Sequence, residues 1–430
     1  MLKSTPKIGA VIVLSLCLAL SALTAAKPVK IVLQYRAGGL RTEAAEAWIA
    51  EFEAENPDIE VEFYPVPSGF TERTMISWLA GVGPDVTEIY GDWGQDYARN
   101  GMFADLRPYV QREFTQKDIL DFWPVAWEAS FVHWGPYKGE QYLIPRYMIT
   151  TVHYYNIEHF ESAGLEDLNR LDAKRQWTYE VLRDYAKKLT VSDGERITRY
   201  GFTTNTKDYR RLDVWARAFG AGFFNLADPR EFWGTRDETV KAMTLLQEMI
   251  WSDQSTAPSF ARGNFFKGLI GIVEEGNHSV LDQFDRTIAG SFSWDLAPSP
   301  VGVNGRKAYS ADNGFGMWRD TPRPEESWRF IKFLTSTRGN EIAAKHEGLA
   351  PVRRSAMPFY QQLAPELNLG VLFTNMEDPG PPLTTLLIGD VKNIADTLNN
   401  ALDRALIKNE KPWAIIAEEI KPLIEGWARQ

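Results

Sequence analysis

The sequence contains almost no cysteine and few histidines. Its 430 residues include one cysteine, Cys17, and five histidines. The rest of the chain therefore holds no disulfide and no cysteine-based zinc site. No two histidines stand at the His-Glu-x-x-His spacing of a metalloprotease helix. We therefore expect no bound metal and no other cofactor.

The short motifs of several enzyme classes are also missing. The chain has no Gly-x-Ser-x-Gly elbow and no Walker A sequence, and its glycine-rich stretches lack a full dinucleotide fingerprint. Glu274 and Glu275 are adjacent, whereas glycosidases draw their two carboxylates from separate elements about 5–10 Å apart. We interpret this pair as a turn after a strand. An exported carbohydrate-active enzyme remains an alternative, because carboxylate enzymes have no diagnostic short motif.

Positive charge is in deficit. The chain has 47 Lys and Arg against 57 Asp and Glu, which gives a formal net charge of −10. This balance argues against a nucleic-acid-binding protein, which would show a basic surface. A hydrophobic share of 44% and a charged share of 24% are typical of a globular protein. At 430 residues the chain exceeds the roughly 250–300 residues that one core supports, so more than one domain is expected.

One apolar run stands at the N-terminus. Lys3 and Lys7 precede the run Ile8–Leu23, which small residues follow. This layout is typical of a secretory signal, here with cleavage after Ala26 and a periplasmic mature protein. A membrane anchor is disfavoured, since about 16 apolar residues fall short of the roughly 20 that span a bilayer. A lipid anchor on Cys17 is a third alternative, which the large apolar residue before it disfavours.

Strand and helix patterns alternate after the N-terminal segment. Apolar residues recur at helical spacing up to Glu55, and alternate at strand spacing over Ile59–Tyr64. Asn56-Pro57 separates the two patterns, because a proline disfavours helix at the residue before it. Further elements are predicted by the same reasoning: strands at Lys30–Tyr35, Val86–Tyr90, Leu269–Val273 and Ala308–Trp318, and helices at Thr71–Ala80, from Thr178, at Thr239–Trp251, over 324–348 and over most of 386–427. Alternation of this kind predicts an α/β fold with mostly parallel sheets.

Five segments in sequence carry a family resemblance: "FEAENPDIEVEF" (52–63), "LAGVGPDV" (79–86), "YARNGMFADLRPYV" (97–110), "TVHYYNIEHFESAGL" (151–165) and "SWRFIKFLTSTRGNEIAAKHEGLAPVRRSA" (327–356). They resemble segments of the family 1 extracellular solute-binding proteins of ABC importers, a family that includes maltose-binding protein. Each motif alone is weak. Their common order and separations carry the resemblance, which extends to about residue 358.

The resemblance implies a two-lobed periplasmic-binding-protein fold, each lobe a mostly parallel sheet flanked by helices, with the ligand cleft at the hinge. It implies a first lobe from 27–145 and 305–350, and a second from 146–304 and the helices of 351–430. It also implies a monomer that delivers its solute to permease subunits in the membrane. Ligands of open α/β sheets bind beyond the carboxyl ends of the strands, which agrees with a site between the lobes.

Candidate ligand contacts follow the ends of predicted strands. Sugars present hydroxyl groups, which polar side chains bind, and C–H faces, which aromatic rings cover. The chain has 15 Trp, 16 Tyr and 23 Phe, of which most must fill cores; Trp48, Trp78 and Trp328 lie on apolar helix faces. The candidate contacts are Tyr35, Arg36, Asp92, Trp93, Arg146, Tyr147, Tyr209, Arg210, Trp215, Asn277, His278, Asn313, Gly314 and Phe315.

Several of these candidates have a structural alternative. Arg146 and Tyr147 could pin the hinge, Trp215 could belong to a core, and Asp92-Trp93 could be a plain turn. The leading functional hypothesis is a periplasmic protein that binds a sugar or oligosaccharide by hinge closure. An anionic solute, such as a sugar acid or a phosphorylated glycerol, is the alternative ligand within the same class.

Overall fold

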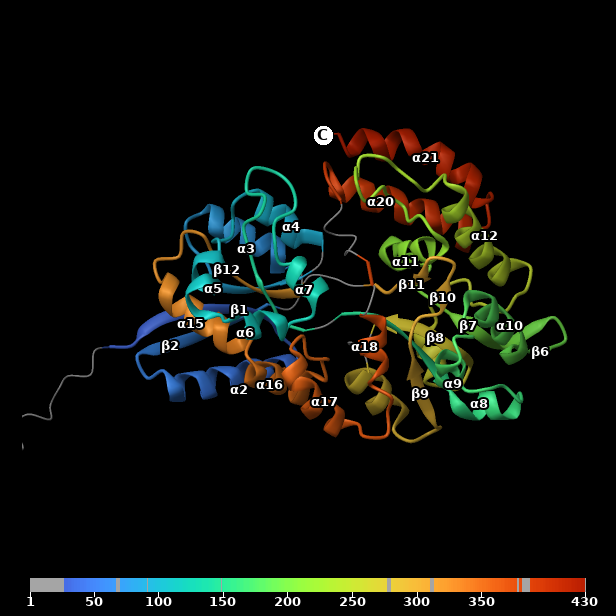
Figure 1. Ribbon diagram of the computed structural model, residues 1–430, viewed down its shortest axis with the longest axis horizontal. Coiled ribbons are helices and arrows are strands. Elements are labelled where there is room, and N and C mark those ends of the chain that lie inside the picture. Colours follow the sequence, from blue (N-terminus) through green and yellow to red (C-terminus); the bar gives the residue numbers. More distant parts are fainter. Residues whose placement is uncertain are drawn as a thin grey trace, which may run out of the picture.

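The computed structural model describes residues 27–66, 70–90, 92–147, 149–276, 280–309, 313–376, 379–380 and 387–429. The N-terminal segment with the expected signal, together with Asn277 and His278, lies outside these ranges. Figure 1 shows two lobes, one built mainly from the blue, cyan and orange parts of the chain and one from the green, yellow and red parts. Each lobe contains a five-stranded sheet with helices packed around it. Within the described ranges, no helix combines the length and apolar character that crossing a membrane requires.

The first sheet has the strand order β2-β1-β3-β12-β4. β1 pairs in parallel with β2 and β3, whereas β12 runs antiparallel to β3 and β4. β12 enters from the opposite direction because the chain returns to this sheet after building the other one. The strands are β1 (Val29–Arg36), β2 (Ile59–Val66), β3 (Val86–Tyr90), β4 (Ile144–Pro145) and β12 (Asn313–Met317).

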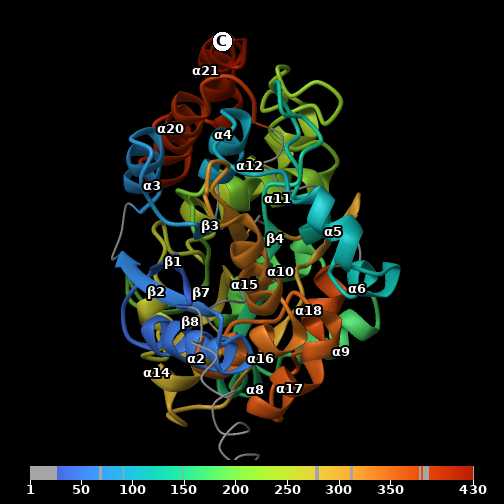
Figure 2. The same cartoon turned by 90° about the vertical axis from the view of Figure 1, so that its left-hand side faces the viewer.

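Nine helices belong to the described segments before β4 and after β12 up to residue 363. They are α2 (Leu40–Glu55), α3 (Phe70–Leu79), α4 (Asp92–Arg99), α5 (Arg107–Glu113), α6 (Gln116–Leu120), α7 (Pro124–Glu128), α15 (Pro324–Leu334), α16 (Thr337–Glu347) and α17 (Met357–Leu363). α2 and α16 lie side by side beneath the first sheet (Figure 2). The predicted single helix over 324–348 is wrong in one respect, since it is divided into α15 and α16. Ser336 caps the second of these, its side chain accepting a hydrogen bond of 3.0 Å from the Gly339 amide.

The second sheet has the strand order β6-β7-β8-β5-β9. Only β7 and β8 pair in parallel among its described strands, so both sheets are mixed rather than mostly parallel. The strands are β5 (Thr151–Asn156), β6 (Val191–Asp193), β7 (Arg196–Thr203), β8 (Ile270–Gly276) and β9 (Trp294–Ala297), and a small hairpin joins β10 (Val301–Gly302) to β11 (Gly305–Arg306).

The helices around the second sheet come from the middle and the end of the chain (Figure 1). They are α8 (Ile157–Ser162), α9 (Leu168–Ala173), α10 (Tyr179–Leu189), α11 (Tyr209–Phe219), α12 (Asp237–Trp251), α13 (Arg262–Phe265), α14 (Arg286–Ile288), α18 (Val371–Asn375), α20 (Val391–Leu402) and α21 (Trp413–Trp427). The chain also forms two short π-helices, η2 (Val280–Asp285) and η4 (Asp403–Ile407), and one 3-10 helix, η3 (Arg354–Ala356). The predicted cap of α10 is confirmed, because the Thr178 side chain accepts a hydrogen bond from the Val181 amide.

One predicted strand end is wrong. β8 continues through Gly276, so Glu274 and Glu275 are buried strand residues and not a turn. The three tryptophans assigned to cores, Trp48, Trp78 and Trp328, are all buried. One small apolar cluster also forms where the chain passes between the sheets. Tyr147, Ile149 and Leu349 are buried together there, and Tyr309 packs against them.

Candidate solute-binding site

Glu88 is the centre of a buried ionic cluster in the first lobe. It stands on β3, and its side chain has no exposed surface. Arg36 lies at the carboxyl end of the neighbouring strand β1, and its Nε and Nη2 each donate a hydrogen bond of 3.0 Å to the Glu88 carboxylate. The Nη1 of Arg146 donates a third bond of 3.1 Å. This two-sided pairing fixes the end of β1 against β3.

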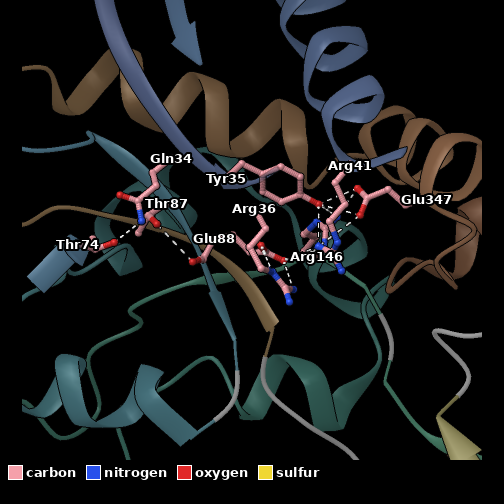
Figure 3. Close-up of polar contacts among 9 residues, drawn as sticks. All are labelled: Gln34, Tyr35, Arg36, Arg41, Thr74, Thr87, Glu88, Arg146 and Glu347. Carbon is pink, nitrogen blue, oxygen red and sulfur yellow. Dashed lines mark hydrogen bonds and ion pairs between the residues drawn. The ribbon is translucent and has the colours of Figure 1, made fainter. Parts of the chain in front are cut away.

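Glu347 is the second acid of the cluster. It is the last residue of α16, and its Oε1 accepts a hydrogen bond of 2.7 Å from the Tyr35 hydroxyl. Arg146 Nη2 donates to both Glu347 and the Tyr35 hydroxyl. Arg41 Nη1 lies 3.5 Å from Glu88 and 3.6 Å from Glu347. We call this set the first-lobe cluster: Tyr35, Arg36, Arg41, Glu88, Arg146 and Glu347. Figure 3 shows these side chains pointing toward one another.

The first-lobe cluster holds three arginines against two glutamates. Burial disfavours the charged form of Glu88, but the charges of Arg36, Arg146 and Arg41 outweigh it and hold the pKa of Glu88 below its usual range. Burial also raises the pKa of Tyr35 well above its usual value, so its hydroxyl remains a neutral donor. Glu88 is therefore charged at neutral pH, and by formal charge the cluster has one positive charge in excess.

Aromatic rings surround Arg146. Its Cζ lies 4.9 Å from the ring centres of Tyr35 and Tyr147, 5.5 Å from Trp48 and 5.8 Å from Phe315. A guanidinium at these distances gains a cation–π attraction that strengthens when water is excluded, and only 1% of Arg146 is exposed. The structure thus joins five of the predicted site residues, Tyr35, Arg36, Arg146, Tyr147 and Phe315, in one place.

The remaining first-lobe candidates lie beside the same strand ends. Asn313 is the first residue of β12 and is 3% exposed, yet neither its Oδ1 nor its Nδ2 has a hydrogen-bond partner. Gly314 serves close packing, since a Cβ there would stand 2.3 Å from the Ile144 carbonyl oxygen. Asp92 and Trp93 are the first two residues of α4, one residue beyond β3. Their side chains are not among those that the structure describes.

The second-lobe candidates lie on α11, and their surroundings differ. Trp215 is 1% exposed, donates from Nε1 to Glu274 Oε2 at 3.0 Å, and packs against Tyr179, which agrees with the alternative of a core residue. Tyr209 is buried, and its amide donates to Asn399 of α20. Arg210 is half-buried and donates to Asp208.

A second ionic cluster was missed by the sequence reasoning. Arg211 Nη2 donates to Glu275 Oε1 at 2.5 Å, and Arg262 Nη1 donates to Glu275 Oε2 at 3.3 Å. Asp208 Oδ2 lies 3.7 Å from Arg211 Nε. We call these four residues the second-lobe cluster: Asp208, Arg211, Arg262 and Glu275. The acids Glu274 and Glu275 directly after an apolar run were the available signal, as was Glu88 on β3.

The two clusters lie on either side of the segments that connect the sheets. The chain passes from β4 to β5 through 146–150, and returns from β11 to β12 through 307–312. Tyr147 belongs to the first crossing and stacks on Arg146, while Tyr309 belongs to the second and lies 5.9 Å from the Arg211 guanidinium. Both tyrosines belong to the same apolar cluster, so the first-lobe cluster and the second-lobe cluster each border a crossing segment at the junction of the lobes.

Two surface cavities are found elsewhere. One of about 700 Å³ lies beside α5 and α6 and includes Lys117, Lys332 and Arg353. Another of about 500 Å³ lies beside α8 and α9 and includes Asp167 and Asp295. Neither is lined by a predicted site residue, and no group of metal-binding side chains was found among the described residues.

Comparison with known proteins identifies the family. Residues 38–341, more than half of the chain, match the family of bacterial extracellular solute-binding proteins. The chain belongs to this family. This solute-binding protein is 25% identical over 383 residues to a provisionally named binding protein of Brucella abortus strain 2308, covering 85% of each chain.

Solved structures share the fold of this solute-binding protein at low sequence identity. The sugar-binding protein MalE of Xanthomonas citri superposes with a TM-score of 0.78 at 17% identity, covering 93% of this chain and 98% of that one. A substrate-binding protein of Listeria monocytogenes in complex with cycloalternan gives a TM-score of 0.76 at 19% identity, covering 93% and 99%. The expected family and two-lobed fold class are therefore confirmed, and the protein is a bacterial extracellular solute-binding protein whose fold resembles that of MalE.

Proposed function

We propose that the protein binds a saccharide between its lobes and delivers it to the permease of an ABC importer without converting it. The observation that carries this proposal is the convergence of Tyr35, Arg36, Arg146 and Tyr147, from two distant segments, at the junction of the lobes. Ligand sites favour such junctions between domains. The sugar and cycloalternan named for the two matched structures support the choice of ligand class.

The proposed mechanism is hinge closure. A solute held between the lobes contacts both of them only in the closed state, so it binds that state more tightly and shifts the population toward it. The proposed hinge is formed by the two crossing segments, of which the structure describes residues 146–147, 149–150 and 307–309. The permease then distinguishes the closed, loaded form from the open one.

The proposed lobes are 27–145 with 305–350, and 146–304 with 351–430. All strands of the first sheet fall within the first pair of ranges, and those of the second sheet within 146–304, which supports the division. Helix α17, although part of 351–430, packs against α16. The proposed solute contacts are the fourteen candidates of the sequence analysis, of which those on β1, β12 and residues 146–147 lie nearest to the first-lobe cluster.

Export and monomeric state belong to the same proposal. Cleavage after Ala26 would release a periplasmic protein that begins at Lys27. Mass spectrometry of the exported protein measures this directly. A retained N-terminus or a lipid on Cys17 would contradict a free periplasmic protein.

A thermal-shift screen over mono-, di- and oligosaccharides tests the function. A ligand at 100 times its dissociation constant adds about 2.7 kcal/mol to the free energy of unfolding, which is a readily measured shift. Recovery of the saccharide unchanged supports a binding protein, whereas turnover of a labelled oligosaccharide would establish the enzyme alternative. No shift with any saccharide would contradict the proposal.

An anionic solute is the second candidate ligand. The excess positive charge of the first-lobe cluster, three arginines against two glutamates, favours it locally in a chain whose formal net charge is −10. Sugar acids and glycerol phosphate belong in the screen for this reason. A shift with these anions alone would replace the neutral saccharide as the ligand.

A further inference from the structure

Arg211 is a buried cation with unused hydrogen-bond donors. Its side chain is 9% exposed, and Nη2 is its one nitrogen with a hydrogen bond, to Glu275. Its Nε and Nη1 are fully buried and have no hydrogen-bond partner. A buried donor without an acceptor is unfavourable, and more so when the group is charged.

Arg211 lies beside the junction of the lobes, where a bound solute could supply the missing acceptor. It lies in the first turn of α11, which follows the carboxyl end of β7, and its partner Glu275 is the penultimate residue of β8. Its guanidinium lies 5.9 Å from the ring of Tyr309, on the segment that returns to the first lobe. The unused donors are therefore next to the junction of the lobes.

The first lobe has a matching feature. Asn313 begins β12, directly after that returning segment, and its amide is buried without a partner. Its neighbour in the sheet is Tyr90, the last residue of β3, and its carbonyl accepts a hydrogen bond from the Arg146 amide. Among the described residues, each lobe thus has a buried polar side chain with unused bonding capacity beside the crossing segments, Asn313 in the first and Arg211 in the second.

We propose that Arg211 is a solute-contacting residue of the second lobe, which donates from Nη1 to oxygen acceptors of the bound saccharide. This inference rests on the proposed function and adds a residue to its site. A guanidinium presents several donors in one plane and so fits two adjacent oxygens. Vicinal hydroxyls of a neutral sugar and a carboxylate of an acidic sugar both supply that pair.

The test uses the full mature protein and two series of saccharides. The neutral series is maltose, maltotriose and cellobiose, and the acidic series is galacturonate, digalacturonate and trigalacturonate. Calorimetric titration of the wild type identifies which probe binds. Binding of the neutral series assigns hydroxyl acceptors to Arg211, and binding of the acidic series assigns a carboxylate.

Variants then separate a binding role from a structural one. Arg211→Lys keeps the charge beside Glu275 but loses the planar set of donors, and we expect it to weaken binding of that probe at least tenfold. The matched control is Arg217→Lys, which makes the same change at a second buried arginine of α11, paired with Asp213, and should change affinity less than twofold. Melting temperatures without ligand should stay within a few degrees of the wild type for both variants.

Two results would overturn the inference in different ways. If Arg211→Lys binds the probe as tightly as the wild type, Arg211 does not contact the solute, although the proposed function stands. The same conclusion follows if Arg217→Lys loses as much affinity as Arg211→Lys, because the effect then comes from changing any buried arginine of α11. If the wild type binds neither series, the saccharide function itself fails, and the role of Arg211 fails with it.

Discussion

The Tyr35 hydroxyl donates a hydrogen bond of 2.7 Å to Glu347, a residue 312 positions later in the chain. Tyr35 is the penultimate residue of β1, and Glu347 ends a helix built after the chain has returned from the second lobe. Arg146, on the outward crossing, bonds to both. Three distant segments of the chain therefore meet at the junction in one buried ionic cluster of the first lobe.

Removal of Glu347 should destabilise the protein strongly. Glu347→Gln leaves Arg146 with one buried counter-charge fewer, and breaking a buried pair in this way costs about 3–5 kcal/mol. Glu325→Gln removes an exposed partner of Arg112 and should cost less than about 1 kcal/mol. Urea unfolding of the two variants measures the difference. Equal losses would show that the cluster contributes no more than a surface pair.

Glu88 should make the protein sensitive to acid. Its pKa is lowered in the folded state from the reference value of 4.5, so the unfolded chain binds the proton first as the pH falls. The stability that Glu88 contributes is present above pH 4.5 and is lost as the pH falls from there toward its folded pKa. Glu88→Gln should be less stable at pH 7 and lose less stability between pH 5 and 3. An unchanged slope would contradict this assignment.

His153 should add a second pH dependence nearer to neutrality. It is 1% exposed between Trp177 and Phe202, and burial, together with the charge of Arg306, lowers its pKa from 6.5 to about 3. The unfolded chain therefore takes up a proton below pH 6.5 that the folded chain refuses. Stability should fall by up to about 1.4 kcal/mol per pH unit below that point.

The measurement for His153 is the free energy of unfolding between pH 7 and 5, a range in which carboxylates titrate little. His153→Gln removes the titrating group and should give the shallower slope. His159 titrates in both proteins and cancels in the comparison. Parallel slopes for the two proteins would mean that His153 takes up its proton in the folded state.

Asp92 and Trp93 should contribute to solute binding. They are the first two residues of α4, one residue beyond β3, and so do not belong to the strand. In a strand, neighbouring side chains would point to opposite faces and could not both contact one solute. Trp93→Ala should weaken saccharide binding by roughly 1–3 kcal/mol, the scale of a lost buried aromatic contact. Asp92→Asn should cost roughly 1.5–3 kcal/mol if its carboxylate accepts hydroxyl bonds.

The expected effect of these two variants depends on the charge of the ligand. An anionic solute would be bound as tightly or more tightly by Asp92→Asn, and Arg36→Ala would then be the damaging change. Calorimetric titration with circular dichroism for folding separates the cases. If neither Asp92 nor Trp93 affects any ligand, the site does not extend to the start of α4.

Local patterns in the sequence predicted most of the fold. The helix that ends at Glu55 and the strand Val86–Tyr90 are both found at the predicted ends, because periodicity and proline act over a few residues. The end of β8 was missed, since Glu274 and Glu275 look like turn residues alone. Their burial depends on Trp215 and Arg211, about sixty residues earlier.

The first-lobe cluster was anticipated only in part for the same physical reason. Tyr35, Arg36 and Arg146 are among the sequence candidates because they stand at strand ends or on a crossing, which local pattern and family resemblance indicate. Their partners Glu88 and Glu347 lie on a strand and a helix that read as ordinary elements. A buried acid is recognisable only through the arginines that pair with it, and those pairs join distant parts of the chain.

Small-angle scattering of the mature protein with and without saturating saccharide tests the central claim most directly. Binding between two lobes that close around the hinge predicts a smaller radius of gyration in the presence of the saccharide. An unchanged radius at saturation, for a protein whose free form is shown to be open, would contradict solute binding by closure.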